Sequence, residues 1–392
     1  MSRKLNITPW PLFTKEEANR VSEVLLSNKV NYWTGQEGRE FEKEFAHFTD
    51  SEYAIAVSNG TTALDLALNA LDIGTGDEVI VTSRTFIASI SSIVNAGAKP
   101  VFADVDANTQ NITAETITAV LSSKTKAIIC VHLAGWPCEM DEIMVLAEKH
   151  GLKVIEDCAQ AHGARYKGRS VGCVGHISAW SFCQDKIMTT GGEGGMVTTN
   201  DKNLWSRMWS FKDHGKSYDA IYNREHPPGF RWVHESFGTN WRLTEMQSAI
   251  GRIQLTRMKD WTRIRGEHAA KLVHVCREFN CIRVPSIPDY IKHANYKFYV
   301  FVEPQQLNEG WTRDKILEAL NTQGIPAMQG SCSEVYLEKA FDNTGLRPEK
   351  SLPVAKILGE TSLMFQVHPT ITAEQMNQVC ESLRSILQSA SK

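Results

Sequence analysis

The chain has 392 residues, of which 42% are hydrophobic and 22% charged, and this ordinary composition argues against disordered and fibrous classes. Its net charge of −3 comes without a block of Lys or Arg, and no apolar run approaches the roughly 20 residues of a membrane helix, so we expect neither nucleic-acid nor membrane binding. The N-terminal segment lacks the apolar core of a signal peptide, which favours a cytoplasmic protein. The nine cysteines have no repeated spacing and are interpreted as free thiols.

Two amphipathic helices are predicted near the N-terminus. Thr14 and Glu17 have the spacing of a capping box at the start of the first, over residues 14–29. The second covers residues 39–50 and carries an aromatic stripe on one face, formed by Phe41, Phe45 and Phe48. We interpret this stripe as core or as a contact between subunits.

A strand over residues 53–57 is followed by the polar turn SNGTT, from which a helix begins. The free N–H groups and the positive dipole end of such a helix favour a bound phosphate, which makes Gly60 and Thr61 candidate phosphate-binding residues. Capping of the helix by Ser58 or Thr61 is the simpler alternative. After the next strand, Phe86 lies at a strand-to-helix junction, where its ring can stack on a flat cofactor or belong to the core.

Apolar strands and helical segments then alternate as far as Asp157. This alternation predicts an α/β fold with a mostly parallel sheet between two layers of helices. In such sheets ligands bind beyond the carboxyl ends of the strands. Gly60, Phe86, Asp157 and Lys186 all lie at or just beyond predicted strand ends, so we expect them to converge.

The stretch from residue 179 to 201 contains the most reactive candidate. A strand ending at Ser181 is followed by a polar turn with Lys186, a Gly-rich loop and a second strand. A partly desolvated lysine loses its proton more easily and can form a Schiff base with a carbonyl, for which pyridoxal 5′-phosphate (PLP) is the simplest cofactor. For this segment alone, a solvated lysine in a β-hairpin is the competing interpretation.

Asp157 and Gln160 follow an apolar strand. A carboxylate held in a cleft requires a cation, and a protonated pyridine nitrogen would supply one while keeping the ring an electron sink. Capping of the next helix or pairing with an arginine explains Asp157 equally. Gln160 can donate to the ring hydroxyl or cap the turn.

The pattern changes in the C-terminal third of the chain. Residues 216–238 are polar and aromatic and predict an irregular loop, in which Arg231 could contact a diphosphate. After a turn at Asn240 and long helical periodicity, short helices and a hairpin-like strand over residues 296–302 predict a smaller α+β domain. We expect a large domain over residues 1–262 and a small domain over residues 263–392.

Taken together, these motifs resemble the DegT/DnrJ/EryC1/StrS family of PLP-dependent sugar-nucleotide aminotransferases, which has the PLP-dependent transferase fold type I. The resemblance covers nearly the whole chain, and its most specific parts are VIEDCAQAHGA, SFCQDK and GEGGMVTTND in that order. It implies that Lys186 is the catalytic, Schiff-base lysine, that Asp157 pairs with the pyridine nitrogen and that Gln160 neighbours the ring hydroxyl. It places Phe86 on the ring, and it assigns the phosphate to Gly60, Thr61, Ser181 and, from the other subunit of a homodimer, Asn240.

The resemblance also implies a reaction. L-Glutamate would donate its amino group to C4 of a nucleotide-linked 4-keto-6-deoxy sugar for lipopolysaccharide or another surface glycan, with Lys186 as general base and acid. Residues 181–195 resemble members that convert UDP-2-acetamido-2,6-dideoxy-4-hexulose to UDP-4-amino-4,6-dideoxy-N-acetylglucosamine on the bacillosamine route. One family branch replaces the lysine with histidine and dehydrates its substrate; because Lys186 is retained, we predict transamination.

Three alternatives remain at this stage. The acceptor could be a GDP- or dTDP-linked sugar or a 3-keto sugar. The chain could be a non-catalytic protein of the same fold, although the complete set of Lys186, Asp157 and Gln160 argues against this. It could bind zinc through residues of metal-ligand type, namely Cys158, His162, Cys173, His176 and Cys183. Their spacing matches no paired Cys-x-x-Cys pattern, so we predict no metal site.

Overall fold

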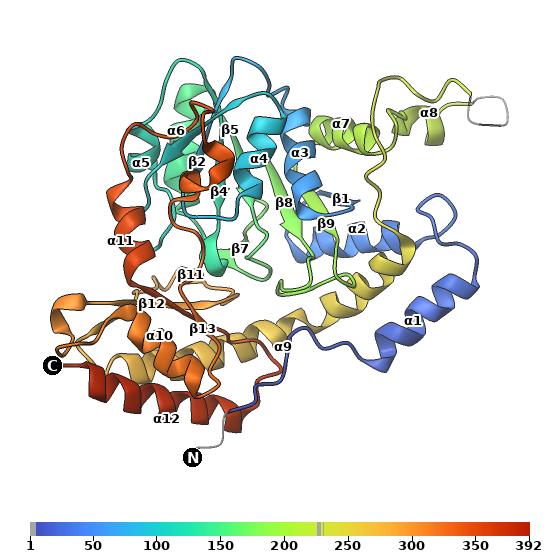
Figure 1. Ribbon diagram of the computed structural model, residues 1–392. Helices are drawn as coiled ribbons and strands as arrows, with labels where there is room; N and C mark the ends of the chain where they lie inside the picture. The colour runs from blue at the N-terminus through green and yellow to red at the C-terminus, as the bar shows by residue number, and fades with distance from the viewer. Residues whose placement is uncertain (1–4, 226–228, 230) are drawn as a thin grey trace.

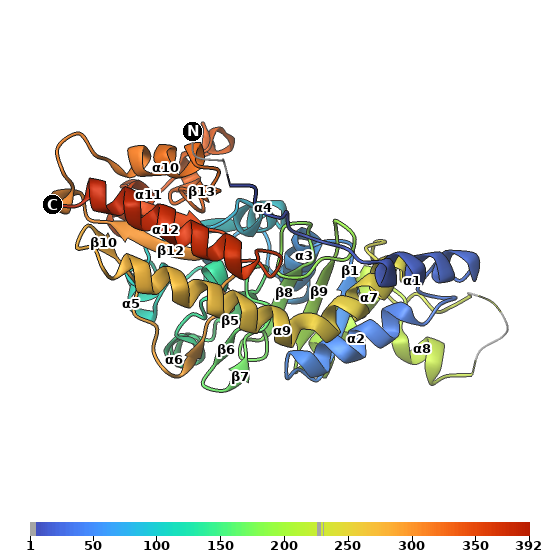
Figure 2. The ribbon, with the colours of Figure 1, turned by 90° about the horizontal axis from the view of Figure 1, so that it is seen from below.

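The computed structural model describes residues 5–225, 229 and 231–392 (Figure 1). Within these ranges the chain forms two packed parts, one around a seven-stranded sheet and one around a four-stranded sheet. The helix α9 (Glu245–Cys276) runs from the first part to the second, and Figure 2 shows it crossing the underside of the molecule. The predicted division between residues 262 and 263 falls inside this helix and stays a prediction.

The seven-stranded sheet has the order β1-β9-β8-β5-β4-β2-β3, and β9 is the strand that runs antiparallel to its neighbours. Its strands are β1 (Tyr53–Val57), β2 (Glu78–Thr82), β3 (Lys99–Ala103), β4 (Thr125–Val131), β5 (Lys153–Asp157), β8 (Ile177–Ser181) and β9 (Gly195–Thr199). The predicted mostly parallel sheet is confirmed. Because the strands other than β9 share one direction, their carboxyl ends meet at one edge.

Helices cover both faces of this sheet, as the alternation of elements predicts. Val79 and Val81 of β2 pack into the core shared with α3 and α4, whereas Ile80 packs on the opposite face with residues of α6. The first face is covered by α3 (Gly60–Ala70), α4 (Ala88–Asn95) and α7 (Lys202–Lys212), and the second by α2 (Glu37–Phe48), α5 (Ala114–Thr118) and α6 (Met140–His150). Phe41 and Phe45 of α2 are fully buried, so the aromatic stripe belongs to the core.

The second part contains a four-stranded antiparallel sheet in the order β10-β12-β14-β13. Its elements are β10 (Ile282–Arg283), β12 (Phe298–Val302), β13 (Ala327–Met328), β14 (Ser362–Phe365), α10 (Arg313–Thr322) and α12 (Ala373–Ala390). Figure 2 shows α12 lying alongside the C-terminal half of α9. All residues of β12 are buried, so both faces of this strand are covered.

Two helix starts test the sequence predictions. The capping box of Thr14 and Glu17 is present at the start of α1 (Lys15–Leu26), as predicted. The alternative caps predicted for α3, Ser58 and Thr61, are wrong. Because α3 begins at Gly60, the residue before it, Asn59, is the cap, and its side chain accepts a hydrogen bond of 2.9 Å from the backbone of Thr62.

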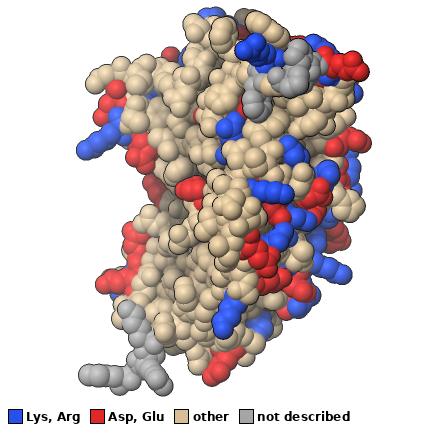
Figure 3. All heavy atoms as spheres, turned by 90° about the vertical axis from the view of Figure 1, so that its right-hand side faces the viewer, with Lys and Arg blue, Asp and Glu red and all other residues tan. Residues whose placement is uncertain are grey.

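The segment over residues 216–238 is only partly irregular, because it contains the short helix α8 (Tyr218–Tyr222), and residues 226–228 and 230 lie outside the described part. Within the described ranges, the remaining strands and α-helix are β6 (Arg165–Tyr166), β7 (Arg169–Ser170), β11 (Ile291–Lys292) and α11 (Pro353–Thr361), and four short 3-10 helices lie in the loops (Leu133–Gly135, Pro304–Gln306, Val335–Leu337 and Lys339–Phe341). The face in Figure 3 carries positive and negative side chains interspersed. Among the described helices, none has the length and apolar character needed to cross a membrane.

Candidate active site

A cavity of about 780 Å³ opens at the carboxyl ends of the parallel strands. Residues that follow β1, β2, β5 and β8 line one side of it, and residues around β12, β13 and β14 line the other. All predicted site residues except Asn240 line this cavity, namely Gly60, Thr61, Phe86, Asp157, Gln160, Ser181 and Lys186. The topology therefore brings these residues together, while the role of each remains a proposal.

The N-terminus of α3 forms one end of the cavity. The Asn59 side chain accepts a hydrogen bond from the N–H of Thr62. The N–H groups of Gly60 and Thr61 lie in the first turn of the helix, where the helix itself offers them no acceptor. A Cβ atom on Gly60 would lie 2.6 Å from the Cβ of Ser181, so glycine is required for this close approach of the helix to β8. The arrangement offers two N–H groups and the Ser181 hydroxyl to an anion such as phosphate.

Asp157 at the end of β5 is a buried carboxylate that lacks a cation. It is 6% exposed, its Oδ2 accepts from the Ser89 hydroxyl at 2.8 Å, and its Oδ1 accepts from the Ala159 N–H at 3.1 Å. Both donors are neutral, and no ion pair to Asp157 exists among the residues that the structure describes. A buried carboxylate is stabilised by a positive partner, and a protonated pyridine nitrogen in the cavity fits this requirement.

Lys186 projects its amine into the same cavity from a fixed turn. Its backbone N–H donates to the carbonyl of Cys183 at 3.1 Å, and its carbonyl accepts from the Trp10 indole at 2.7 Å. Its Nζ lies 3.9 Å from Asp185 Oδ1 and 5.3 Å from the centre of the Tyr296 ring. With 16% of its side chain exposed, Lys186 is neither the solvated hairpin lysine of the competing interpretation nor a lysine locked in a close salt bridge.

Gln160 and Phe86 both line the cavity and offer groups that suit a flat ring. The Ala134 N–H donates to Gln160 Oε1 at 2.8 Å, which leaves the amide NH₂ of Gln160 as a donor for the cavity. Phe86 is 69% exposed and lines the cavity, so its ring does not belong to the core. An exposed aromatic face at a cavity wall is suited to stacking.

Tyr296, Lys297 and Tyr299 also line the cavity, and sequence reasoning missed them. They come from the stretch predicted as a hairpin-like strand, in which Lys297 is the one charged residue of a run of aromatic and apolar residues. A single charged residue inside an otherwise apolar run was the one sign in the sequence that this stretch faces a cavity. The Tyr296 hydroxyl donates to Asp185, and burial together with the Asp185 charge raises the pKa of Tyr296, so it remains a donor.

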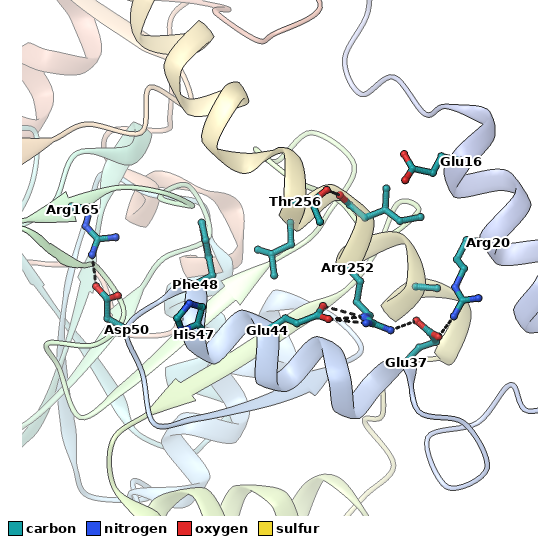
Figure 4. Close-up of a pocket in the computed structure, with 13 residues that line it drawn as sticks. Glu16, Arg20, Glu37, Glu44, His47, Phe48, Asp50, Arg165, Arg252 and Thr256 are labelled. Carbon is teal, nitrogen blue, oxygen red and sulfur yellow. Dashed lines mark hydrogen bonds and ion pairs between the residues drawn. The ribbon is translucent and has the colours of Figure 1, made fainter.

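A second cavity of about 760 Å³ lies between α1, α2 and α9 (Figure 4). Several of its charged side chains form ion pairs with one another: Arg252 contacts Glu44 at 2.7 Å and Glu37 at 2.9 Å, and Arg20 also contacts Glu37. Figure 4 shows these pairs along one wall. Since its cations and carboxylates satisfy each other, this cavity is a poorer candidate for an active site.

One buried group of metal-ligand type exists among the described residues, formed by His132, Glu156 and Cys158. His132 donates to Glu156 at 2.9 Å and accepts from the Cys138 N–H at 3.0 Å, while Glu156 also accepts from three backbone N–H groups of residues 172–175. Burial raises the pKa of the Cys158 thiol well above its usual value. The ligand atoms of His132 and Glu156 are thus occupied by protein partners, and of the five residues predicted as an alternative zinc set only Cys158 belongs to the group.

The fold and the cavity define the class of the protein. The sheet is mostly parallel, and one cavity brings together a helix N-terminus suited to a phosphate, a buried carboxylate without a cation among the described residues and a lysine. These features are typical of a PLP-dependent transferase of fold type I. The DegT/DnrJ/EryC1/StrS aminotransferase family matches residues 11–384, and the chain belongs to this family. It is therefore an aminotransferase, and its cofactor is PLP.

Similar proteins are known in sequence and in structure. The X-ray structure of an aminotransferase from Psychrobacter cryohalolentis is 63% identical, with a TM-score of 0.96 and coverage of 98% of this chain and 99% of that chain. GDP-perosamine synthase of Escherichia coli O157:H7 is 36% identical over 95% of this chain and 96% of its own length. UDP-N-acetyl-3-dehydro-alpha-D-glucosamine 3-aminotransferase of Acidithiobacillus ferrooxidans is 36% identical over 92% of each.

Proposed function

We propose that the chain is a cytoplasmic sugar-nucleotide aminotransferase. It would move the amino group of L-glutamate to C4 of UDP-2-acetamido-2,6-dideoxy-4-hexulose, giving UDP-4-amino-4,6-dideoxy-N-acetylglucosamine for a surface glycan. The observation that carries the proposal is that Lys186 and the uncompensated carboxylate of Asp157 share one cavity. The relatives' names support a nucleotide-linked sugar, with GDP in one and UDP in another. A GDP- or dTDP-linked acceptor and amination at C3 are the alternatives.

The proposed roles follow from the contacts in the cavity. Bound PLP supplies an electron sink for the bond that breaks at the substrate carbon. Asp157 would hold the pyridine nitrogen in its protonated form, and Gly60 and Thr61 would bind the phosphate through backbone N–H groups. Gln160 would donate to the ring hydroxyl through its free NH₂.

Lys186 would move the proton. When the amino donor occupies the cavity, Nζ of Lys186 would take the proton from the α-carbon of glutamate; when the keto sugar occupies it, Nζ would return a proton to C4 of the sugar. Asp185, 3.9 Å from Nζ, would stabilise the ammonium form of Lys186 whenever Nζ carries the transferred proton. The Tyr296 hydroxyl, which donates to Asp185, would hold that carboxylate in place.

A homodimer with shared active sites completes the proposal. Asn240 is exposed and does not line the cavity of its own chain, so its proposed phosphate contact requires a second subunit. The same segment exposes two large aromatic side chains, Trp232 at 85% and Phe237 at 99%. The segment with α8 projects from the body in Figure 1. Exposed aromatic side chains of this kind are typical of a surface that a partner covers.

The cofactor and the half-reaction are tested by an absorbance spectrum of the purified protein before and after L-glutamate is added. We expect a visible band that fades with glutamate in the native protein and is missing in Lys186→Ala. A panel of UDP-, GDP- and dTDP-linked 3-keto and 4-keto sugars then identifies the acceptor, with the product analysed by mass spectrometry and NMR. Absence of a visible band after PLP is added would refute the proposal, and turnover of a GDP- or dTDP-linked sugar alone would move it to that alternative.

A further inference from the structure

Lys297 is a second lysine in the wall of the active-site cavity, on the side opposite the parallel sheet. It immediately precedes β12, is half-buried, and its Nζ lies 4.9 Å from the centre of the Tyr296 ring, the same ring that Lys186 approaches at 5.3 Å. Its ammonium makes no hydrogen bond or close ion pair with any residue that the structure describes. A half-buried lysine at a cavity wall without a bonded partner has three donors available for a ligand.

The charges around Lys297 leave this wall positive. Two cations, Lys186 and Lys297, act on one carboxylate, Asp185, and a third cation, Arg265, acts on Lys297. Asp185 is already engaged, because it accepts from the Tyr296 hydroxyl and lies 3.9 Å from the Lys186 amine. The negative charge of Asp185 is therefore shared between two cations and does not neutralise the positive charge around Lys297.

Arg265 adds a charge that forms no ion pair with a carboxylate in the described part of the chain. Its side chain is 1% exposed, and Nη1 contacts only the backbone carbonyls of Asn295 and Tyr296, at 3.5 and 3.3 Å. Its Nε and Nη2 have no hydrogen-bond partner within the described ranges. Burial lowers the pKa of Lys297 to about 8; Asp185 opposes this shift, and Arg265 and Lys186 add to it. A half-buried positive group of this kind is stabilised when an anion enters the cavity.

The backbone holds Lys297 in a fixed relation to the cofactor-binding residues. The N–H of Tyr296 donates to the Ala134 carbonyl at 2.9 Å, and the N–H of Ala134 donates to Gln160 at 2.8 Å. Tyr296 itself is buried. The backbone next to Lys297 is thus tied through two hydrogen bonds to the residue proposed to contact the PLP ring, so the Lys297 side chain starts from a fixed point on the cavity wall.

We propose that Lys297 is a specificity-determining residue that binds an anionic oxygen of the substrate, a carboxylate of the amino donor or a phosphate of the sugar nucleotide. The inference rests on the proposed function, because both proposed substrates carry such oxygens. The PLP phosphate is not the expected ligand, since its proposed site is the N-terminus of α3 on the other wall. Arg265 lies behind Lys297 and keeps the local potential positive without touching the ligand.

The test compares Lys297→Gln, which removes the charge, with Lys297→Arg, which keeps it, and with Lys292→Gln at an exposed lysine on β11 as a matched control. The holoenzymes are titrated by calorimetry with glutarate, a dicarboxylate that cannot react, and with UDP. Losing a charge-assisted hydrogen bond weakens binding by roughly 10- to 100-fold. We expect Lys297→Gln to bind one of the two probes that much more weakly, Lys297→Arg to recover most of the affinity, and Lys292→Gln to match the native enzyme.

The affected probe identifies the source of the anion: glutarate points to the amino donor and UDP to the sugar nucleotide. Steady-state kinetics should agree, with KM for that substrate raised more than kcat is lowered. If the native enzyme transaminates and Lys297→Gln has unchanged probe binding and unchanged KM values, the inference about Lys297 is overturned while the proposed function stands. A native enzyme that neither binds the probes nor transaminates any keto sugar would overturn the proposed function itself.

Discussion

The charge state of His162 gives a quantitative test of burial beside the active site. The imidazole is fully buried against the rings of Trp180 and Phe182, with centroids 5.2 and 5.7 Å away, and neither ring nitrogen has a partner among the described residues. Burial, reinforced by the charges of Lys186 and Arg265, lowers the pKa of His162 from 6.5 to about 3. The folded protein therefore keeps this ring neutral at pH values where the unfolded chain protonates it.

The sign and size of the effect follow from this difference. Because the unfolded chain binds the proton below its own pKa, the stability contributed by His162 falls as the pH drops from about 6.5 toward 3. Each pKa unit corresponds to about 1.4 kcal/mol, so on the order of 2 kcal/mol of unfolding free energy is lost at about pH 5. His162→Leu has a similar volume and no titrating group, and it should lose about 2 kcal/mol less than the native protein between about pH 7 and pH 5.

Urea unfolding of the holoenzyme at both pH values, followed by tryptophan fluorescence, measures the difference between the two proteins. His274→Leu is the matched control, because it makes the same substitution at a histidine whose side chain is 82% exposed. Comparing each variant with itself at the two pH values removes the effect of the substitution on packing. Equal losses in the native protein and in His162→Leu would refute the reasoning.

Three further predictions concern the cavity. Lys186→Ala should lower turnover at least about 100-fold while circular dichroism stays unchanged, because the general base is lost; wild-type rates would disprove the assignment. Asp157→Asn should keep the cofactor but lower kcat by roughly 10- to 1000-fold, since a nearby opposite charge shifts a pKa by roughly 1–3 units; unchanged kinetics would show that Asp157 does not hold the ring nitrogen. Gly60→Ala should weaken PLP binding about 5- to 150-fold in a titration, because the new Cβ would meet the Cβ of Ser181 at 2.6 Å.

The wall of the cavity formed by the parallel sheet could be predicted from the sequence. Periodicity and turn residues locate the ends of β1, β2, β5 and β8, and the geometry of parallel sheets then requires that Gly60, Asp157 and Lys186 converge. The identity of the helix cap could not be predicted in the same way. Ser58, Asn59 and Thr61 are all good caps, and a shift of one residue in the helix start decides between them.

The opposite wall of the cavity could not be predicted from the sequence, for a physical reason. β12 is buried on both faces, so its sequence has no polar alternation that would mark a side facing a cavity. Tyr296 and Asp185 are 111 residues apart in sequence and meet only because residues 294–296 pack on residues 134–135. Phe86 was equally ambiguous, since an aromatic residue at a junction is more often core than exposed.

Arg84 links the two walls. It is fully buried two residues before Phe86, and its guanidinium donates to Gln110 at 3.0 Å, to Ser333 at 2.7 Å and to Ser362 at 3.2 Å, without a carboxylate partner in the described part of the chain. It thereby ties the strand end that carries Phe86 to the segments around the four-stranded sheet.

Because the two walls are linked, each can carry a different part of the proposed function. The residues proposed to hold PLP and move the proton follow strands of the parallel sheet, whereas Lys297 comes from the second part. Under the proposed roles, the second wall could change with the substrate while Lys186 and Asp157 stay where β8 and β5 place them. Relatives whose names specify GDP- and UDP-linked sugars are the proteins in which such a division of roles can be compared. A UDP affinity that depends on Lys297 would place a contact to the sugar nucleotide on this second wall, whereas a dependence of glutarate binding would place the amino donor there.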